Sequence, residues 1–320
     1  MPGSGASGAS GASGASGVAV SGRAVIRHAI DWGELSPLRL RAREVAEGLY
    51  AGIHRSSLRG AGVEFGGYRE YVPGDDLRWL DRRSLLRHDR WIVRQFETET
   101  DRAVSLVLDA SESMTYRGPR APAAKIAYAS VVAAALARVA LANGDPVSLT
   151  FVAGSRTAPV RRASGGDQFE RVVAALESAE PGGDAYAEPD VLDRAIQAVA
   201  RSTRRGSIVV VLSDLLDWPD SAVDAVATLG AGGRVLVVVR VLDPAEAEFP
   251  FEGPVRLRAL EGDSIVETDA ETARARYLSA LARLTEHWKD GIVRRGGRFL
   301  VTTTTQPAVA VVRDIVKAIR

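Results

Sequence analysis

The sequence predicts an α/β protein with a doubly wound, mostly parallel sheet, preceded by an N-terminal extension of mixed strand and helix. From residue 103 onward, short apolar runs rich in β-branched residues alternate with longer segments of helical pattern. The apolar runs at 104–108 and 207–212 are each followed within a few residues by aspartate and serine. Open α/β sheets bind ligands at the carboxyl ends of their strands, so we expect a functional site at this edge.

Composition limits the classes of function. Of the 320 residues, 46% are hydrophobic, and the formal net charge is +1, which gives no whole-chain reason to expect nucleic acid or an anionic membrane as a partner. The chain has no cysteine, so disulfides, thiolate zinc sites and cysteine nucleophiles are excluded. No secretory signal pattern is visible, and we expect a cytoplasmic protein. The apolar segment 126–142 is short, rich in alanine and carries Arg138, which favours a buried helix over a membrane span.

Three regions are expected along the chain. Residues 1–22 are dominated by Gly-Ala-Ser repeats that cannot bury apolar surface, and we expect a disordered tail there. Residues 23–101 form an N-terminal unit, and residues 102–320 form the main domain. In the N-terminal unit we expect a helix over 37–48 that ends at Gly48, strands at 65–72 and 91–98, and a helix at 77–87 between them.

The elements of the main domain follow from its apolar runs and turn signals. We expect strands at 104–108, 147–152, 207–212, 235–241 and 298–302. We expect helices at 122–141, 168–177, 189–200, 221–229, 270–295 and 307–319. Asp167 and Asp269 stand where N-caps belong for two of these helices. Short hairpins are expected at 157–161 and 255–268.

The strand at 104–108 leads into a group of oxygen donors. Asp109, Ser111 and Ser113 occupy alternate positions directly after it. Oxygen-only donors suit a hard cation, and Mg²⁺ prefers an octahedron of them. The alternative is structural, because the same residue types form Asx turns and helix N-caps.

Two further acidic residues are expected near this group. Asp214 follows the strand at 207–212, and Asp184 lies in a glycine-rich loop between the two strands. Neighbouring strand ends meet at one edge of a doubly wound sheet, so these side chains can converge. Asp184 has two interpretations, since it could bind a cation or only close the Gly-Gly turn.

These motifs resemble known families. The run from Asp109 to Met114 is similar to the metal-ion-dependent adhesion site of von Willebrand factor A domains. The segments 62–65, 69–81 and 93–97 resemble the N-terminal signature of the bacterial family called domain of unknown function 58. That family joins this signature to a von Willebrand factor A-like, Rossmann-like domain, and the resemblance covers residues 37–320.

The resemblance implies a Mg²⁺ or Mn²⁺ site with Asp109, Ser111, Ser113 and Asp214 as ligands. The middle loop of the family usually offers Gly-Gly-Thr, whereas this chain has Asp184 after its two glycines. A carboxylate there implies either a stronger direct ligand or a different geometry. The resemblance also implies work with a MoxR-type AAA+ ATPase, as a substrate adaptor or assembly factor.

Three functions compete at this point. The preferred hypothesis is a non-enzymatic, metal-dependent protein-binding module that captures an acidic residue of its partner. The second is a metal-assisted phosphoester hydrolase, but Ser111 stands where aspartate-based phosphatases need a second aspartate, and no P-loop, H-E-x-x-H or G-x-S-x-G string occurs. The third is nucleic-acid binding by the arginine-rich segment 36–94, whose interspersed acidic residues favour internal salt bridges instead.

Overall fold

The fold is built on one central sheet. The computed structural model describes residues 29–56, 68–70, 92–94, 102–183, 189–216, 218–258 and 265–319. Within these residues the central sheet has six strands in the order β10-β7-β6-β3-β4-β5. Neighbouring strands run parallel except at the β4–β5 edge, which is antiparallel. The strand bounds are Val104–Asp109 (β3), Val147–Val152 (β4), Val160–Ala163 (β5), Ile208–Ser213 (β6), Val235–Leu242 (β7) and Arg298–Thr303 (β10).

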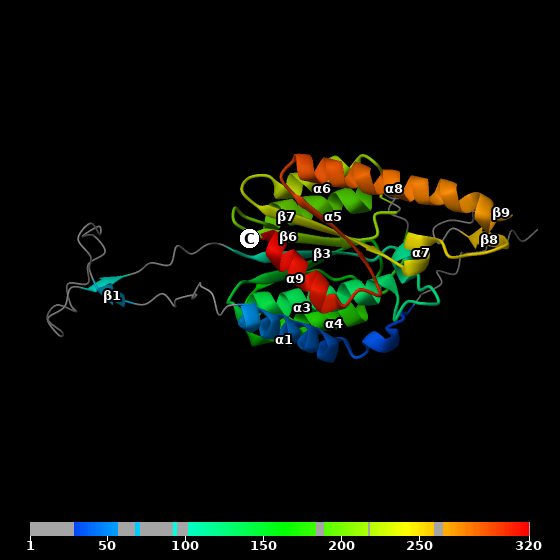
Figure 1. The fold of residues 1–320 in the computed structure, drawn as a ribbon. Helices are drawn as coiled ribbons and strands as arrows, with labels where there is room; N and C mark the ends of the chain where they lie inside the picture. The colour runs from blue at the N-terminus through cyan, green and yellow to red at the C-terminus, as the bar shows by residue number, and fades with distance from the viewer. Residues whose placement is uncertain are drawn as a thin grey trace, which may run out of the picture.

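Helices cover both faces of this sheet, which confirms the predicted α/β fold with a mostly parallel central sheet (Figure 1). One face packs against α3, α4 and α9, and the other packs against α5, α6 and α8. The helix bounds are Lys125–Ala142 (α3), Gly166–Ser178 (α4), Pro189–Ser202 (α5), Ala222–Ala227 (α6), Ala270–Arg294 (α8) and Ala308–Ile319 (α9). The short 3₁₀ helix η4 (Thr228–Gly230) continues α6.

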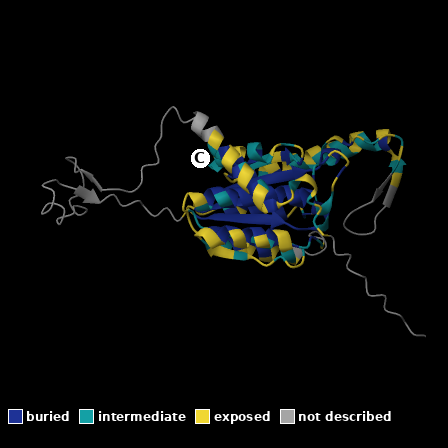
Figure 2. Ribbon diagram, turned by 90° about the horizontal axis from the view of Figure 1, so that it is seen from below, coloured by how far each residue is buried: buried dark blue, intermediate teal, exposed yellow. Residues whose placement is uncertain are grey.

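The side chains of β6 alternate between two hydrophobic cores. Val210 and Leu212 belong to the core that contains α3 and α9, whereas Val209 and Val211 belong to the core that contains α5, α6 and α8. Every residue of β3 and β6 is buried, and the exposed surface lies on the outer helices (Figure 2). A strand that is covered on both faces is mostly apolar along its length. Polar residues of such a strand are therefore expected at its end.

Helix α3 is apolar on all sides because other elements surround it. Helix α1 (Leu38–Ser56) packs along it through Leu38, Ala42, Ala46 and Leu49, which are buried in the same core. By length and composition, α3 is the one helix among the described residues that could cross a membrane. In this fold fifteen of its eighteen residues are buried, as expected for a core helix.

At two helix ends the structure differs from the prediction for a clear physical reason. The first helix continues through Gly48 to Ser56 instead of ending at the glycine. A Cβ on Gly48 would lie 3.3 Å from the side chain of Val309, so the glycine lets α9 approach α1 closely. Asp167 is not an N-cap, since α4 begins at Gly166 with Gly165 before it. The carboxylate of Asp167 lies in the first turn, where the helix dipole favours negative charge.

The sequence analysis missed helix α7 (Pro244–Glu248), which follows β7. Asp243 caps it, with Pro244 at the first helical position. The side chain of Asp243 accepts a hydrogen bond from the backbone of the first turn, and Glu246 accepts one from the backbone of Asp243. This capping box is a signal that the sequence carries, but five residues are too few to show helical periodicity.

The remaining described elements are short. The 3₁₀ helix η1 (Gly33–Leu35) precedes α1, and β1 (Tyr68–Glu70) pairs antiparallel with β2 (Ile92–Arg94), inside the two strands predicted there. Strands β8 (Pro254–Arg258) and β9 (Ile265–Asp269) form the predicted hairpin, and Asp269 caps α8 as expected. The predicted tail at 1–22 and helix at 77–87 lie outside the described residues.

Candidate functional site

The two strands that end in aspartate and serine lie side by side. Strands β3 and β6 pair in parallel with Leu108 opposite Leu212, so Asp109 and Ser213 end the strands together. Strand β4 lies on the other side of β3, so the chain reverses its direction of winding between β3 and β6. Such a switch point opens a crevice beyond the strand ends, which is where doubly wound sheets bind ligands.

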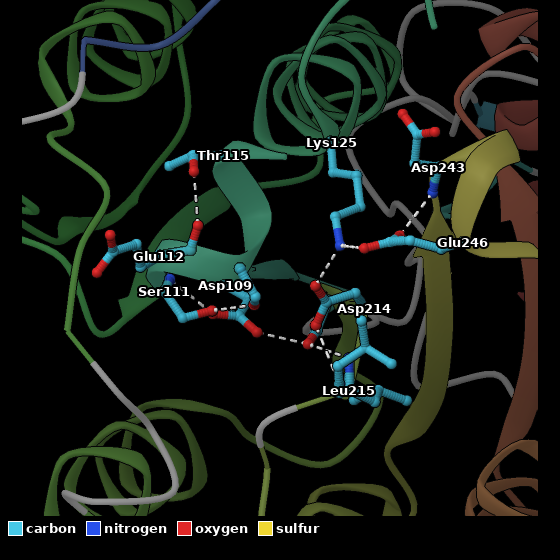
Figure 3. Close-up of polar contacts among 12 residues, drawn as sticks. Asp109, Ser111, Glu112, Thr115, Lys125, Asp214, Leu215, Asp243 and Glu246 are labelled. Carbon is cyan, nitrogen blue, oxygen red and sulfur yellow. Dashed lines mark hydrogen bonds and ion pairs between the residues drawn. The ribbon is translucent and has the colours of Figure 1, made fainter. Parts of the chain in front are cut away.

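The turn after β3 gathers the three residues that the sequence singled out (Figure 3). The backbone N–H of Ser111 donates to Oδ1 of Asp109 over 2.9 Å, and this bond closes the turn. The Oγ atoms of Ser111 and Ser113 lie 3.1 Å apart, with Ser113 in the 3₁₀ helix η3 (Glu112–Thr115). All three side chains are buried. The three side chains of this turn therefore lie close together and are shielded from solvent.

The second carboxylate oxygen of Asp109 is held by residues from the β6 end. Ser213 Oγ donates to Oδ2 over 2.5 Å, and the indole N–H of Trp218 donates to the same oxygen over 2.8 Å. Among the residues that the structure describes, all donors to Asp109 are neutral. Burial and the neighbouring charge of Asp214 raise the pKa of Asp109 to about 6, although its hydrogen bonds act in the opposite direction.

Asp214, the predicted residue at the β6 end, lies beside this group and is also fully buried. Its Oδ1 accepts the backbone N–H of Leu216 over 3.0 Å. Its Oδ2 accepts the ammonium of Lys125 over 2.6 Å. Arg240, from the adjacent strand β7, donates its Nε to the backbone carbonyl of Asp214 over 2.9 Å. The backbone and the side chain of Asp214 are therefore fixed from separate elements.

Lys125 joins the β6 end to α7. Its Nζ also donates to Oε1 of Glu246 over 2.5 Å, and the ring of Tyr116 lies 5.9 Å from the same nitrogen. Burial alone would lower the pKa of Lys125, but the charges of Asp214 and Glu246 outweigh burial and raise it. Lys125 is therefore an ammonium held between two carboxylates inside the protein.

The six charged side chains around this edge, all fully buried except Glu246, do not balance in charge. Four carboxylates, those of Asp109, Asp214, Asp243 and Glu246, face two cations, Lys125 and Arg240. Counted over these six described side chains, the excess is two negative charges, spread over the strand ends and the start of α7. The oxygen donors also match the ligands of hard cations, so the residues present fit Mg²⁺ or Mn²⁺.

The sequence analysis and the structure agree on Asp109, Ser111, Ser113 and Asp214 as neighbours. Asp184, the fifth predicted residue, lies outside the described residues. Within the described part of the chain, no group of three histidine, cysteine or acidic side chains is placed to hold a metal, so the candidate site depends on hydroxyls beside its carboxylates.

Several residues that hold the site in place were missed from the sequence, among them Lys125 and Trp218. Lys125 could have been noticed, because lysine is rare in this chain: 41 residues are lysine or arginine, and only three of them are lysine. Trp218 follows the β6 end by five residues, and nothing in its sequence neighbourhood indicates a bond to Asp109.

The chain is similar in sequence to uncharacterized mycobacterial proteins. It is 28% identical over 239 residues to the uncharacterized protein Rv1480 of Mycobacterium tuberculosis, covering 75% of this chain and 74% of that protein. The uncharacterized protein Mb1516 of Mycobacterium bovis matches with the same values.

Two solved structures match at low similarity. The crystal structure of the conserved hypothetical protein BatB from Bacteroides thetaiotaomicron is 18% identical, with 68% of this chain and 98% of that chain covered and a TM-score of 0.42. The structure of an aerotolerance-related membrane protein from Bacteroides fragilis has the same identity and coverage, and a TM-score of 0.43.

The comparison with family models gives the assignment. The model described as protein of unknown function DUF58 matches residues 67–287. This match spans more than half of the 320 residues, and the chain therefore belongs to the DUF58 family.

Proposed function

We propose that the β3 and β6 strand ends form a metal-ion-dependent adhesion site of the von Willebrand factor A type, in a non-enzymatic protein-binding module. One observation carries the proposal. Asp109 is fully buried next to the hydroxyls of Ser111 and Ser113, and its described donors are all neutral. A buried carboxylate without a cation is costly, so this arrangement favours the binding of one.

The donor set indicates which cation and which role. Hydroxyl and carboxylate oxygens suit Mg²⁺ or Mn²⁺. When bound, the ion would supply positive charge and an open coordination position at the sheet edge. Ser111 and Ser113 would hold the ion, and Asp109 would fix their turn and balance part of the ion's charge. An acidic residue of a partner would complete the coordination of the ion.

The non-enzymatic assignment is supported by the state of Asp109. A nucleophilic carboxylate needs a free oxygen that faces its substrate. Both oxygens of Asp109 accept hydrogen bonds, and Oδ2 accepts two of them. This geometry suits a carboxylate that organises its neighbours. No observation on the described residues favours the phosphoester hydrolase.

The partner class rests on the family resemblance alone. We infer a protein that presents an aspartate or glutamate to the cation, and a MoxR-type AAA+ ATPase is the candidate that the resemblance suggests. The inferred compartment is the cytoplasm, and the inferred role is that of an adaptor or assembly factor.

Calorimetric titration of Mn²⁺ or Mg²⁺ into the full chain tests the proposal. The wild-type protein should bind one equivalent, and Asp109→Asn, which keeps the shape but removes the charge, should weaken binding at least about tenfold. Asp290→Asn is the matched control, because Asp290 lies exposed on α8 and pairs only with the neighbouring Arg294 among the described residues. Absence of binding to wild type, or equal binding by Asp109→Asn, would reject the proposal.

A further inference from the structure

We propose that Lys125 is an internal counter-ion that withholds Asp214 from the cation, so that the site binds metal weakly until a partner supplies an acid. The inference rests on the proposed function, and it assigns a role to a side chain outside the predicted ligand set. Lys125 is a positioning residue in this account, since it acts on the cation through Asp214.

The two oxygens of the Asp214 carboxylate have different partners. Oδ2 is occupied by the ammonium at 2.6 Å, and Oδ1 accepts the backbone N–H of Leu216 at 3.0 Å. Both side chains of the Lys125–Asp214 pair are fully buried, so water does not screen the pair. Figure 3 shows the ammonium of Lys125 between Asp214 and Glu246, with Asp109 and Ser111 on the side of Asp214 away from Glu246.

Lys125 also occupies an unfavourable position in its helix. It is the first residue of α3, where the N-terminal end of the helix dipole disfavours positive charge. Burial of an ammonium adds a further cost. The two carboxylates of Asp214 and Glu246 offset both, and Glu246 is itself fixed by the backbone N–H of Asp243 at 2.9 Å. The ammonium of Lys125 therefore depends on these two carboxylates, and they in turn are committed to it.

The consequence concerns the charge that a bound cation would meet. With Asp214 paired to Lys125, Asp109 is the carboxylate of the described predicted ligands that has no cationic partner. A divalent ion there would keep an excess of positive charge and attract an anionic oxygen from outside. Lys125 would thus convert a self-sufficient acidic cluster into a site that depends on its partner.

A pair of substitutions separates this role of Lys125 from a general change in the electrostatic field around the cation. Lys125→Met combined with Glu246→Gln removes one positive and one negative charge, so the net charge of the buried group is unchanged while Asp214 is released. We expect this double variant to bind Mn²⁺ at least about tenfold more tightly than wild type. Glu246→Gln alone leaves the ammonium to Asp214 and adds positive charge, so it should bind Mn²⁺ more weakly than wild type.

Lys289→Met is the matched control, because Lys289 is exposed on α8 and pairs with Glu286 in the same helix. It should bind Mn²⁺ as wild type does. Circular dichroism melting of each variant without metal checks that the fold is retained. If the double variant does not fold, binding of Mn²⁺ by Glu246→Gln as tight as that of wild type would still contradict the proposal.

The outcomes separate the two proposals. Tighter binding by the double variant with weaker binding by Glu246→Gln supports the role of Lys125. If wild type binds Mn²⁺ through Asp109 and the double variant is no tighter, the inference about Lys125 is overturned while the proposed function stands. If neither protein binds Mn²⁺, the proposed function fails and the inference fails with it.

Acetate tests the dependence on an external acid. In wild type, acetate should strengthen Mn²⁺ binding several-fold, because it supplies the missing carboxylate. In the double variant the effect should be smaller, since Asp214 already supplies one. An equal effect of acetate on both proteins would contradict the proposal.

Discussion

The indole N–H of Trp218 donates to Oδ2 of Asp109 across 109 positions of sequence, over a distance of 2.8 Å. Trp218 also packs edge-on against Trp288 of α8, with ring centroids 5.8 Å apart. The bond therefore ties the turn after β3 to the core between the sheet and α8. Both tryptophans are buried and in contact, but only Trp218 bonds to a carboxylate. Comparing the same substitution at the two positions therefore isolates the contribution of that hydrogen bond to stability.

Trp218→Phe should destabilise the protein more than Trp288→Phe does. Both substitutions remove the same atoms from a buried ring, but only the first takes a donor from a buried carboxylate. Trp288 Nε1 is buried and has no hydrogen-bond partner among the described residues. The difference in unfolding free energy, measured with urea, should be about 2 kcal/mol. Equal losses for the two variants would show that the bond to Asp109 contributes nothing.

Helix α1 should be part of the same cooperative unit as the sheet. Leu49 is buried against the core that contains α3, whereas Leu40, on the same helix, is 49% exposed. Leu49→Ala should lower the unfolding free energy by about 3 kcal/mol, and Leu40→Ala should change it by no more than about 0.5 kcal/mol. Denaturant unfolding followed by far-ultraviolet circular dichroism measures both. A Leu49→Ala variant as stable as wild type would mean that α1 does not fold with the main domain.

Tyr128 should make stability fall at alkaline pH. Its hydroxyl donates to the backbone carbonyl of Gln306 over 2.6 Å, and burial raises the pKa of Tyr128 to about 12, against an ordinary value of 10.0. The folded state holds the proton that the unfolded state releases, so stability is complete below pH 10 and is lost as pH rises from 10 towards 12. The loss from this residue should reach about 2 kcal/mol.

Tyr128→Phe provides the comparison for this effect. The variant should be about 1 kcal/mol less stable at neutral pH, because it lacks the hydrogen bond to Gln306. The gap between the two proteins should narrow above pH 10, since only wild type carries the ionising phenol. Urea unfolding at several pH values measures it. A gap that stays constant up to pH 11 would contradict the assignment.

Much of the fold could be predicted because local patterns encode it. The strands β3, β6 and β7 are mostly apolar runs and β4 alternates apolar with polar residues, and both patterns are visible in the sequence. The helix boundary at Gly48 could not be predicted, since the glycine serves contact with Val309, far along the chain. Local propensity favoured an end there, and packing between α1 and α9 overrode it.

Some residues of the candidate site could likewise be predicted from the sequence, whereas others could not. Asp109, Ser111 and Ser113 are predictable because they stand on one turn after one strand. Asp214 is predictable because parallel strands end at a common edge. Lys125 and Trp218 are not predictable from spacing, since each reaches the site from an element whose position depends on tertiary packing.

The most direct test of the central claim is the anomalous scattering of Mn²⁺ in a crystal of the full chain. The account predicts one difference peak at the β3 and β6 strand ends, about 2 Å from the Oγ atoms of Ser111 and Ser113 and next to Asp109. The peak should vanish in Asp109→Asn. A wild-type crystal with no peak there, or with its Mn²⁺ bound elsewhere, would contradict the account.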